Sequence, residues 1–409
     1  MRILWISFYG TWTMPLLQRI KDGNKLGIII PKPDTASDSK EVRDGITFYN
    51  LALTKNECRK IMTRTIFGKY RRFIEDFKPD IIHVHGTEKN LAQIQNFITD
   101  IPIVISIQGI LTGYKQYAFN YLDAKNVHKH RTIKNYLGIG GCDLMYRYFQ
   151  NGEKYEADIL KNGQFFIGRT AWDKAHILLN NPQARYYHGE ELLRNEFYEN
   201  AASWNLEECN RHTIFMPSGF NPIKGMHLAI EAVGLLKTQF PDIRLVIPGM
   251  FNDIFKKQRL TSWVWGEEYV RYIKRLILKL DLKDQIQFLP RLDAAQMVGQ
   301  MRKSNVFLSP SSIDNSPNAV GESMMIGTPI VTTPVGGELS FLTDNETVLF
   351  APAGDPYMMA YQLKRIFEDD MLAVRLSRNA HNVALKRHDR NQTSMQYLSI
   401  YKEIVDVFT

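Results

Sequence analysis

Residues Ser309–Gly337 read SPSSIDNSPNAVGESMMIGTPIVTTPVGG, and this stretch decides the fold. The short apolar run Asn305–Leu308 comes directly before it and is typical of a buried strand. Turn-forming residues follow, and a helical pattern begins at Ala319. The helix is expected to end at Gly327, because glycine with a proline close behind is a common helix C-terminus. A second buried strand is expected over Pro329–Thr333, so the stretch predicts one repeat of a parallel α/β sheet.

This repeat carries two acidic residues, Asp314 in the loop and Glu322 on the helix. A helix N-terminus has unpaired backbone N–H groups and the positive end of the helix dipole, so it suits an anion such as a phosphate. A carboxylate beside it can accept hydrogen bonds from both hydroxyls of a vicinal diol such as a ribose. The alternative is a structural unit whose loop is merely polar, and the spacing alone leaves both interpretations open.

Strand and helix patterns alternate along the whole chain in two successive sets. Strands are expected over Arg2–Phe8, Leu26–Pro31, Asp80–Gly86, Ile103–Gly109, Gln164–Gly168 and Arg185–Tyr187, then over Thr213–Pro217, Ile243–Pro248, Gln285–Leu289 and the two strands above. Helices are expected over 53–77, 88–98, within 110–160, and over Met226–Gln239, 266–280, Ala294–Lys303, 357–367, 371–386 and Asn391–Phe408. This pattern predicts an α/β fold of two doubly wound, Rossmann-like domains that face each other across a cleft.

The polar run Asn205–His212 is typical of a linker between these domains. The first domain is therefore expected over residues 1–207 and the second over 208–385. Residues 386–409 are expected to form a helix that packs back on the first domain.

The first domain carries candidate ligand-binding residues where its expected strands end. Gly10 lies in the loop after the first strand, although no GxGxxG dinucleotide motif follows. His85 and Gln108 each lie at the end of a β-branched run, and Arg169 ends a third strand. A buried guanidinium needs an anionic partner, either a ligand or, as the structural alternative, Asp173.

A metal site is not expected at these strand ends. His83 shares a face with His85 and is expected to point into the core. No third histidine or acid lies at the spacing of a metal ligand set.

The second domain has a further strand, loop and helix at Ser218–Gly225, SGFNPIKG. Lys224 enters the helix there, where a cation can neutralise a phosphate beside unpaired N–H groups. An ordinary surface lysine is the alternative, and the loop context favours the functional interpretation.

Composition and charge limit the possible classes of protein. The chain has 409 residues, 44% of them hydrophobic, and a formal net charge of +8 that comes mainly from its first half. Basic clusters in 51–150 indicate either a solvated face or an approach to an anionic membrane or a phosphate-bearing substrate. Nucleic acid is not an expected partner, because no nucleic-acid motif accompanies the charge.

The expected location is the cytoplasm, at the inner face of the membrane if a membrane is involved. No apolar run approaches the ~20 residues of a spanning helix, and the first residues are not typical of a signal peptide. The three widely spaced cysteines, Cys58, Cys142 and Cys209, fit a reducing compartment.

Taken together, these residues resemble the retaining glycosyltransferases of the GT-B fold, group 1 (family 4). The resemblance rests on DNSPNAVGE at 314–322, SMMIGTPIVTTPVGG at 323–337, IKG at 223–225 and the strand-ending DIIHVHG at 80–86. It covers most of 213–356, whereas the first half matches only in layout.

The resemblance implies that the second domain binds a nucleotide diphosphate sugar, a UDP- or GDP-sugar. The first domain would bind the acceptor, a glycan or a lipid-linked sugar in surface polysaccharide synthesis. A hexosyl group would be transferred with retention at the anomeric carbon, and without a cofactor or metal.

The resemblance also assigns roles to residues. Lys224 would stabilise the leaving diphosphate and Asp314 would contact the transferred sugar, so these two are the expected catalytic residues. Glu322 would hold the ribose hydroxyls. The other expected donor-binding residues are Gly10, Gln108, Arg169, Ser218, Gly219, Asn318, Ala319 and Val320, and the acceptor-side candidates are His85 and Trp172.

Three positions depart from the family pattern. The family commonly has glutamate at Asp314, which is one methylene shorter. An arginine usually stands where this chain has Gly219, so Arg169 or Arg291 would have to replace it at the diphosphate. A histidine often stands at Gln108, and glutamine keeps hydrogen bonding but cannot carry a proton.

Two alternative functions share this interpretation of the nucleotide site. A sugar-nucleotide epimerase of the same fold would use the donor without an acceptor. A non-catalytic relative would bind nucleotide or polysaccharide and regulate a partner, an alternative that rests on fold analogy.

Overall fold

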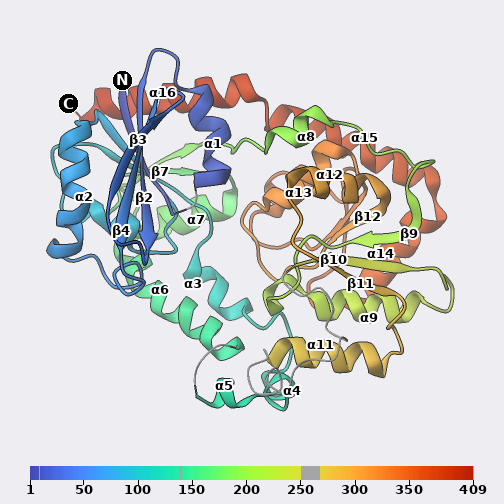
Figure 1. Ribbon diagram of the computed structural model, residues 1–409. Helices are drawn as coiled ribbons and strands as arrows, with labels where there is room; N and C mark the ends of the chain where they lie inside the picture. The colour runs from blue at the N-terminus through green and yellow to red at the C-terminus, as the bar shows by residue number, and fades with distance from the viewer. Residues whose placement is uncertain (9, 138–140, 250–267, 409) are drawn as a thin grey trace. The chain divides into compact units, whose positions relative to one another are not determined.

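The computed structural model describes residues 1–8, 10–137, 141–249 and 268–408 and divides into two compact units (Figure 1). The N-terminal unit comprises Met1–Gly113, Phe149–Leu193 and His388–Thr409, and the C-terminal unit comprises Tyr114–Tyr148 and Arg194–Arg387.

These bounds differ from the expected domains, because residues 114–148 and 194–207 belong to the C-terminal unit. Side-chain and backbone hydrogen bonds explain both differences. Asn120 Nδ2 donates to the carbonyl oxygen of Pro310 over 3.0 Å. The backbone N–H of Trp204 donates to the carbonyl oxygen of Ile326 over 3.0 Å. Such contacts between distant segments are not visible in a local sequence pattern.

The N-terminal unit is built on an eight-stranded sheet with the order β3-β4-β2-β1-β5-β6-β7-β8. Its strands are β1 (Arg2–Ile6), β2 (Lys25–Pro33), β3 (Ser39–Arg43), β4 (Ile46–Leu53), β5 (Ile81–His85), β6 (Ile103–Ser106), β7 (Phe165–Gly168) and β8 (Arg185–His188). Every neighbouring pair is parallel except β3 and β4, which form an antiparallel hairpin. This hairpin was not predicted, because β3 is polar and exposed along its whole length.

Apolar side chains cover both faces of this sheet. Successive residues of β1 alternate between two cores: Ile3 and Trp5 belong to one, and Leu4 and Ile6 to the other. The period of two follows from the pleat of a strand, and burial on both faces is typical of a parallel sheet. The central strands are therefore hydrophobic on both faces.

Helices supply the covering layers of the N-terminal unit. They are α1 (Gly10–Arg19), α2 (Arg64–Phe77), α7 (Ala171–Asn180), α16 (Arg390–Phe408), the 3-10 helix η1 (Asn90–Asn96) and most of α6 (Cys142–Asn162). α1 and α16 lie side by side on one face (Figure 1), where Arg19 Nη1 donates to Asn391 Oδ1 over 3.1 Å. α16 also contributes Tyr397 and Tyr401 to the core on that face.

The C-terminal unit has a six-stranded, fully parallel sheet with the order β11-β10-β9-β12-β13-β14. Its strands are β9 (Asn210–Phe215), β10 (Arg244–Pro248), β11 (Ile286–Leu289), β12 (Ser304–Ser309), β13 (Ile330–Thr332) and β14 (Leu349–Phe350). Its described helices include α4 (Ala124–His128), α5 (Ile133–Tyr136), α8 (Asn195–Glu199), α9 (Met226–Leu236), α11 (Glu268–Lys279), α12 (Ala294–Lys303), α13 (Asn318–Ile326), α14 (Pro356–Glu368) and α15 (Asp370–Arg387). The predicted α/β class with two doubly wound domains is confirmed.

Some predicted boundaries were wrong. The helix expected from residue 53 begins only at Arg64, because Thr63 caps it by accepting the N–H of Ile66. β9 begins inside the expected linker 205–212. The helix expected over 88–98 is a shorter 3-10 helix, η1. Residues 266 and 267 of the helix expected over 266–280 lie outside the described residues, as does Tyr9 in the first strand's loop.

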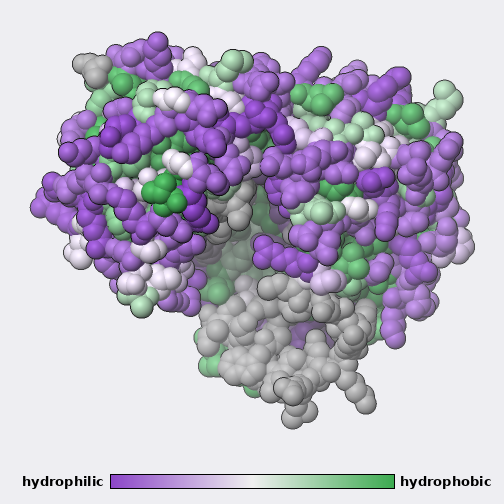
Figure 2. All heavy atoms as spheres, turned by 45° about the horizontal axis from the view of Figure 1, so that its top comes forward, coloured by the Kyte–Doolittle hydropathy of each residue, from purple (hydrophilic) through white to green (hydrophobic). Residues whose placement is uncertain are grey.

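The surface seen in Figure 2 is mainly hydrophilic, with apolar residues scattered among the charged ones. Within the described ranges, no helix combines the length and the apolar character needed to cross a bilayer.

Candidate functional site

The stretch Ser309–Gly337 forms the strand, loop, helix and strand that the sequence predicts. β12 ends at Ser309, and α13 begins at Asn318 after a loop. α13 ends at Ile326, and its C-cap, Gly327, adopts the left-handed conformation with φ 89°. The helix from Val320 to Ile326, which includes Glu322, is buried.

The loop places the first turn of α13 at the carboxyl edge of the sheet. Asn318 and Ala319 open the helix there, where backbone N–H groups point out of the helix end. The N–H of Val320 already donates to the carbonyl oxygen of Pro317 over 3.0 Å. Of the three expected N–H groups, that of Val320 is therefore already engaged within the first turn of α13.

Lys224 and Asp314 meet at this edge. Lys224 Nζ lies 2.6 Å from Asp314 Oδ2, and the half-buried lysine ends the 3-10 helix η3 (Pro222–Lys224) after β9. β9 and β12 are neighbours in the sheet, so their two loops lie together. Although desolvation lowers the pKa of Lys224, the charge of Asp314 outweighs it and leaves that pKa above its usual value. The structure thus brings the two expected catalytic residues into one ion pair.

Two glycines let the backbone approach closely around this pair. Gly225 has φ 75°, and a Cβ there would lie 2.1 Å from the carbonyl oxygen of Pro310. Gly336 has φ 54°, and a Cβ there would lie 2.0 Å from the carbonyl oxygen of Asp314. The N–H of Gly337 donates to that same oxygen over 3.0 Å. The IKG and VGG motifs therefore hold the loops that carry Lys224 and Asp314.

Glu322 is held by an arginine that the sequence did not point to. Arg194 Nε lies 2.8 Å from Glu322 Oε1, and Arg194 Nη2 lies 2.9 Å from Oε2. Burial raises the pKa of Glu322 and Arg194 opposes the rise. The role of Glu322 toward ribose hydroxyls stays a prediction. The guanidinium orients its carboxylate while lone pairs on both oxygens stay available for hydroxyl donors.

A pocket of about 420 Å³ opens at the carboxyl ends of β9, β10 and β11 in the C-terminal unit. Its lining combines apolar side chains with two guanidinium groups and a hydroxyl. The lining residues are Arg194, Pro217, Ser218, Phe220, Pro248, Gly249, Arg291, Leu292 and Met297. Apolar walls suit a flat ring and guanidinium groups suit a phosphate, so the lining fits a nucleotide.

Gly219 lies beside Ser218 but packs inward. A Cβ at Gly219 would lie 3.1 Å from the Cβ of Met226 and 3.4 Å from Ile247. Of the two expected replacements for the missing arginine, Arg291 lines this pocket. Arg169 belongs to the N-terminal unit and is buried there.

Arg169 and Gln108 form a cluster with Glu191 within the N-terminal unit. Arg169 Nη1 lies 2.8 Å from Glu191 Oε2, and Gln108 Nε2 donates to Glu191 Oε1 over 2.6 Å. Glu191 is thus an anionic partner of the Arg169 guanidinium. Asp173, the partner suggested from the sequence, accepts the backbone N–H of Arg169 over 2.9 Å and forms the capping box of α7 with Thr170.

The acceptor-side candidates also belong to the N-terminal unit. His85 is buried, its ring centroid 4.3 Å from that of Trp5, and burial lowers its pKa to about 3, so it is neutral. His83 points into the core as predicted, where its Nδ1 lies 2.6 Å from the Tyr401 hydroxyl. Trp172 is partly buried on α7 and packs on His176. Gly10 is the first residue of α1.

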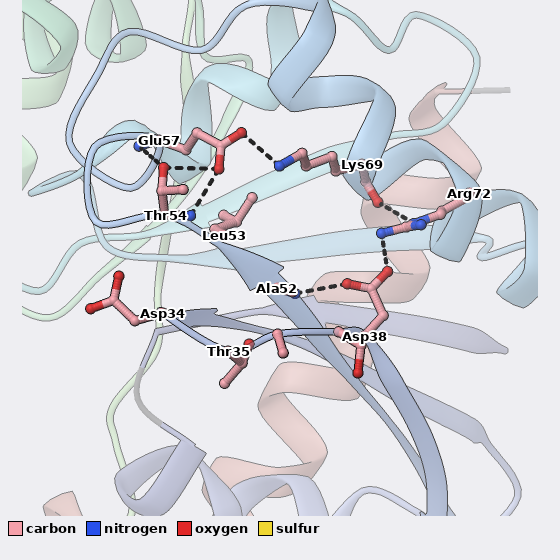
Figure 3. A pocket seen from close by; sticks show the side chains of 11 residues that line it. Asp34, Thr35, Asp38, Ala52, Leu53, Thr54, Glu57, Lys69 and Arg72 are labelled. Atoms are coloured by element: carbon pink, nitrogen blue, oxygen red, sulfur yellow. Dashed lines mark hydrogen bonds and ion pairs between the residues drawn. The ribbon is translucent and has the colours of Figure 1, made fainter.

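The N-terminal unit has a pocket of its own, of about 400 Å³, where β2 and β4 end (Figure 3). Acidic and basic side chains alternate with hydroxyls around it. Asp38 accepts the N–H of Ala52 over 2.8 Å and pairs with Arg72. Glu57 pairs with Lys69 at 2.6 Å. The basic residues of α2 are thus partly neutralised by neighbouring acids.

Within the described residues, no group of three or more histidine, cysteine, aspartate or glutamate side chains could hold a metal ion. The expected absence of a metal requirement stays a prediction.

Two family models match most of the chain. The model "Glycosyl transferases group 1" matches residues 199–383, and "Glycosyl transferase 4-like" matches residues 2–133. The chain belongs to the group 1 glycosyltransferases. The predicted family is thereby confirmed, and the two matches fall on the two halves of the chain.

Curated relatives of this glycosyltransferase include phosphatidyl-myo-inositol mannosyltransferases. The phosphatidyl-myo-inositol mannosyltransferase of Mycobacterium leprae is 26% identical over 54% of this chain and 61% of its own length. That of Mycolicibacterium smegmatis is 25% identical over 67% of this chain and 75% of its own length. The chain therefore matches about three fifths of the first relative and three quarters of the second.

Solved structures share the GT-B fold across almost the whole chain. Sucrose-phosphate synthase from Thermosynechococcus elongatus superposes with a TM-score of 0.73 at 15% identity and covers 99% of both chains. HepE from Anabaena, solved in complex with UDP-glucose, gives a TM-score of 0.66 at 14% identity and covers 98% of this chain and 99% of its own. These similarities establish the fold.

Proposed function

We propose that this glycosyltransferase moves a hexosyl group from a nucleotide diphosphate sugar to a glycan or lipid-linked acceptor, with retention at the anomeric carbon. The observation that carries the proposal is the 2.6 Å ion pair between Lys224 and Asp314. It joins the two motif loops in the unit that also holds the arginine-lined pocket. A cation, an acid and a helix N-terminus at one point suit a sugar diphosphate.

Each group has a separate task in this proposal. Breaking the bond between the anomeric carbon and its oxygen leaves negative charge on the diphosphate. Lys224 and the N–H groups at the start of α13 stabilise that charge most in the transition state. The carboxylate of Asp314 accepts a hydrogen bond from a hydroxyl of the transferred sugar. The leaving phosphate can take the acceptor's proton, so the mechanism needs no separate base from the protein.

The nucleoside is assigned to the pocket beside this site. Phe220, Leu292 and Met297 give its base an apolar surface, and Ser218 offers a hydroxyl. Arg291 supplies the positive charge that Gly219 cannot. Glu322, oriented by Arg194, accepts from the ribose hydroxyls.

The acceptor is assigned to the N-terminal unit. The pocket of Figure 3 offers carboxylates of Asp38 and Glu57 that are already held in place, with hydroxyls of Thr35 and Thr54 beside them. An oxygen that already accepts one hydrogen bond can accept another, so this lining suits a hydroxyl-rich saccharide. The two mannosyltransferase relatives carry a lipid in their names, and a lipid-linked acceptor in surface polysaccharide synthesis fits the same proposal.

A contact with an anionic membrane from the cytoplasmic side belongs to this proposal. The net charge of +8 comes mainly from the first half and supports it. The ion pairs of Lys69 and Arg72 with Glu57 and Asp38 reduce the charge available on α2.

The test is a panel of UDP- and GDP-sugars. At least one donor should raise the melting temperature or be hydrolysed slowly without an acceptor, and binding of none would refute the proposal. Lys224→Ala and Glu322→Ala should each abolish turnover. Wild-type rates in both variants would show that the site lies elsewhere.

Product analysis separates the alternatives. Conversion of the donor to its epimer without an acceptor would indicate an epimerase. Nucleotide binding without hydrolysis, transfer or epimerisation would indicate a non-catalytic member.

A further inference from the structure

A third acid, Glu338, interacts electrostatically with both members of the Lys224–Asp314 pair. It follows the Gly336–Gly337 turn as the first residue of η4 (Glu338–Ser340), and no part of it is exposed. Its Oε2 lies 2.7 Å from Thr332 Oγ1 on β13. Its Oε1 has no hydrogen-bond partner within the described part of the chain. An ionised carboxylate at this fully buried position would have one charged oxygen without a hydrogen bond. Because burying a charge without compensating hydrogen bonds is costly, this argues against a negative charge on Glu338.

The hydrogen-bond count at Thr332 points the same way. Thr332 Oγ1 lies 3.1 Å from the carbonyl oxygen of Ser309 and 2.7 Å from Glu338 Oε2. A hydroxyl has one proton to donate, and a carbonyl oxygen can only accept. Both contacts can be hydrogen bonds at once only if the Glu338 carboxyl carries a proton and donates it to Thr332. If Glu338 ionises, Thr332 must give up one of the two bonds.

The charged groups around Glu338 come from the two motif loops. Burial raises the pKa of Glu338 well above its usual value, and Asp314 on the β12–α13 loop raises it further. The contact with Thr332 and the charge of Lys224 on the β9–α9 loop oppose this rise. With Glu338 neutral, Lys224 and Asp314 balance each other. With Glu338 ionised, the three groups would carry one excess negative charge.

We propose that Glu338 is a positioning residue that keeps its proton in the working enzyme, so that Lys224 stays available to an anionic donor. The inference rests on the proposed function and deepens it, since it assigns a control on anion binding to the same site. Loss of the proton to solvent places a second negative charge beside Lys224 and costs Thr332 one of its two hydrogen bonds, to Ser309 on β12 or to Glu338. Both changes weaken binding of a diphosphate.

Glu338→Gln is the decisive variant, because its amide is neutral and its Nε2 can donate to Thr332 as the carboxyl does. Glu338→Met, which is neutral and of similar shape, serves as a second variant should the amide not fold. Glu346→Gln removes an exposed acid of the same unit and is the matched control.

The first measurement uses no ligand. The melting temperatures of the wild type and the variants are followed from acid to alkaline pH. An acid whose pKa is raised by folding holds a proton that the unfolded chain releases, so the wild type loses stability as pH rises from ~4.3 toward that raised value. Glu338→Gln lacks this loss, so its melting temperature should rise relative to the wild type over that window. If the melting temperatures of the wild type and Glu338→Gln instead change in parallel with pH, Glu338 does not keep a proton in the folded chain and the proposal is wrong.

The second ligand-free arm tests the coupling to Lys224. In a Lys224→Met background the lysine no longer lowers the pKa of Glu338. The melting temperatures of chains with and without the Glu338→Gln substitution should therefore continue to diverge up to a higher pH than in the wild-type background. If the melting temperatures diverge over the same pH range in both backgrounds, Lys224 does not affect the proton on Glu338. This outcome does not depend on whether any nucleotide binds.

The third measurement follows UDP and GDP binding against pH. Affinities of the wild type and Glu338→Gln should agree within about twofold where Glu338 is protonated. At alkaline pH the wild type should weaken roughly tenfold more than the variant, with Glu346→Gln following the wild type. Parallel weakening would overturn the link to anion binding. No binding of either nucleotide to any chain at any pH would refute the proposed function, and the ligand-free arms would still decide the state of Glu338.

Discussion

Arg194 donates hydrogen bonds to both carboxylate oxygens of Glu322, at 2.8 and 2.9 Å. The guanidinium therefore fixes the orientation of this carboxylate and neutralises its charge. Glu322 is buried, whereas Arg194 reaches the wall of the pocket. A guanidinium in this bidentate arrangement fixes the direction of the carboxylate more firmly than a lysine would.

Removing one partner of this pair should destabilise the protein more than removing both. Arg194→Met leaves a buried carboxylate without its counter-charge, and we expect a loss of about 2 kcal/mol in the free energy of unfolding. Adding Glu322→Gln to that variant should recover part of the loss. A double-mutant cycle by urea denaturation measures the coupling. Additive effects would contradict the pairing.

Lys224→Met should reduce donor turnover by about 10²–10³-fold, because a preplaced charge on the leaving diphosphate acts mainly in the transition state. Because this variant also leaves the largely buried Asp314 without its counter-charge, the free energy of unfolding is measured alongside turnover. Lys303→Met removes an exposed lysine of α12 and is the control. Steady-state kinetics with excess donor make the comparison. Equal turnover in both variants would remove Lys224 from the mechanism.

The local elements of the site could be predicted because their signals are local. An apolar run, turn residues and a terminal glycine give β12, the loop and α13, whose C-cap at Gly327 was predicted to the residue. α12 likewise spans Ala294–Lys303 as predicted, where Asp293 caps it.

The contacts between elements could not be predicted, because they depend on strand order. Lys224 and Asp314 were each marked by their own loops, yet their ion pair exists because β9 and β12 are neighbours in the sheet. Arg194 lies in a polar stretch with no motif, and only the folded chain brings it to Glu322. Glu338 was missed because a glutamate after a glycine turn is usually solvated, and its burial depends on β13.

One missed element did have a signal. The β3–β4 hairpin turns at Asp44 and Gly45, both with positive φ, and an Asp-Gly dipeptide is typical of such turns. The hairpin was missed because β3 is polar and exposed, and a periodic apolar pattern indicates only strands that bury one face.

Gly336→Ala should disturb the acidic loop, because a Cβ would lie 2.0 Å from the carbonyl oxygen of Asp314. We expect a loss of stability of more than about 1 kcal/mol and weaker donor binding. Gly23→Ala is the matched control, since Gly23 also has positive φ, 75°, but within the described ranges only its own chain neighbours approach its Cβ position within 4 Å. Thermal unfolding and nucleotide titration of both variants separate backbone strain from the steric clash. An equal loss in both would show that the contact with Asp314 is unimportant.

Arg291→Ala should weaken UDP or GDP binding by about tenfold, the usual effect of losing one charge-assisted contact to a phosphate. Arg291 is exposed at the pocket wall, so the melting temperature without ligand should not change. Arg302→Ala is the control, because it removes another arginine of the same unit, one that pairs with Glu208 at 3.8 Å. Isothermal titration of both variants tests the assignment. If Arg291→Ala binds UDP and GDP as tightly as the wild type, Arg291 does not replace the arginine that is absent at Gly219.

The stability of the N-terminal unit should depend on Glu88 near neutral pH. Burial raises the pKa of Glu88 to about 7, the nearby Glu156 adds to the rise, and Arg169 opposes it. The folded chain therefore holds a proton that the unfolded chain releases above ~4.3, so the free energy of unfolding should fall as pH rises from there to about 7. The part of this fall that Glu88 contributes should amount to roughly 2–4 kcal/mol and be complete above about 7. Glu88→Gln should lack this contribution, whereas the exposed Glu41→Gln should keep it. Urea denaturation at a series of pH values on both sides of about 7 measures the difference; parallel curves for the wild type and Glu88→Gln would show that Glu88 is already ionised throughout.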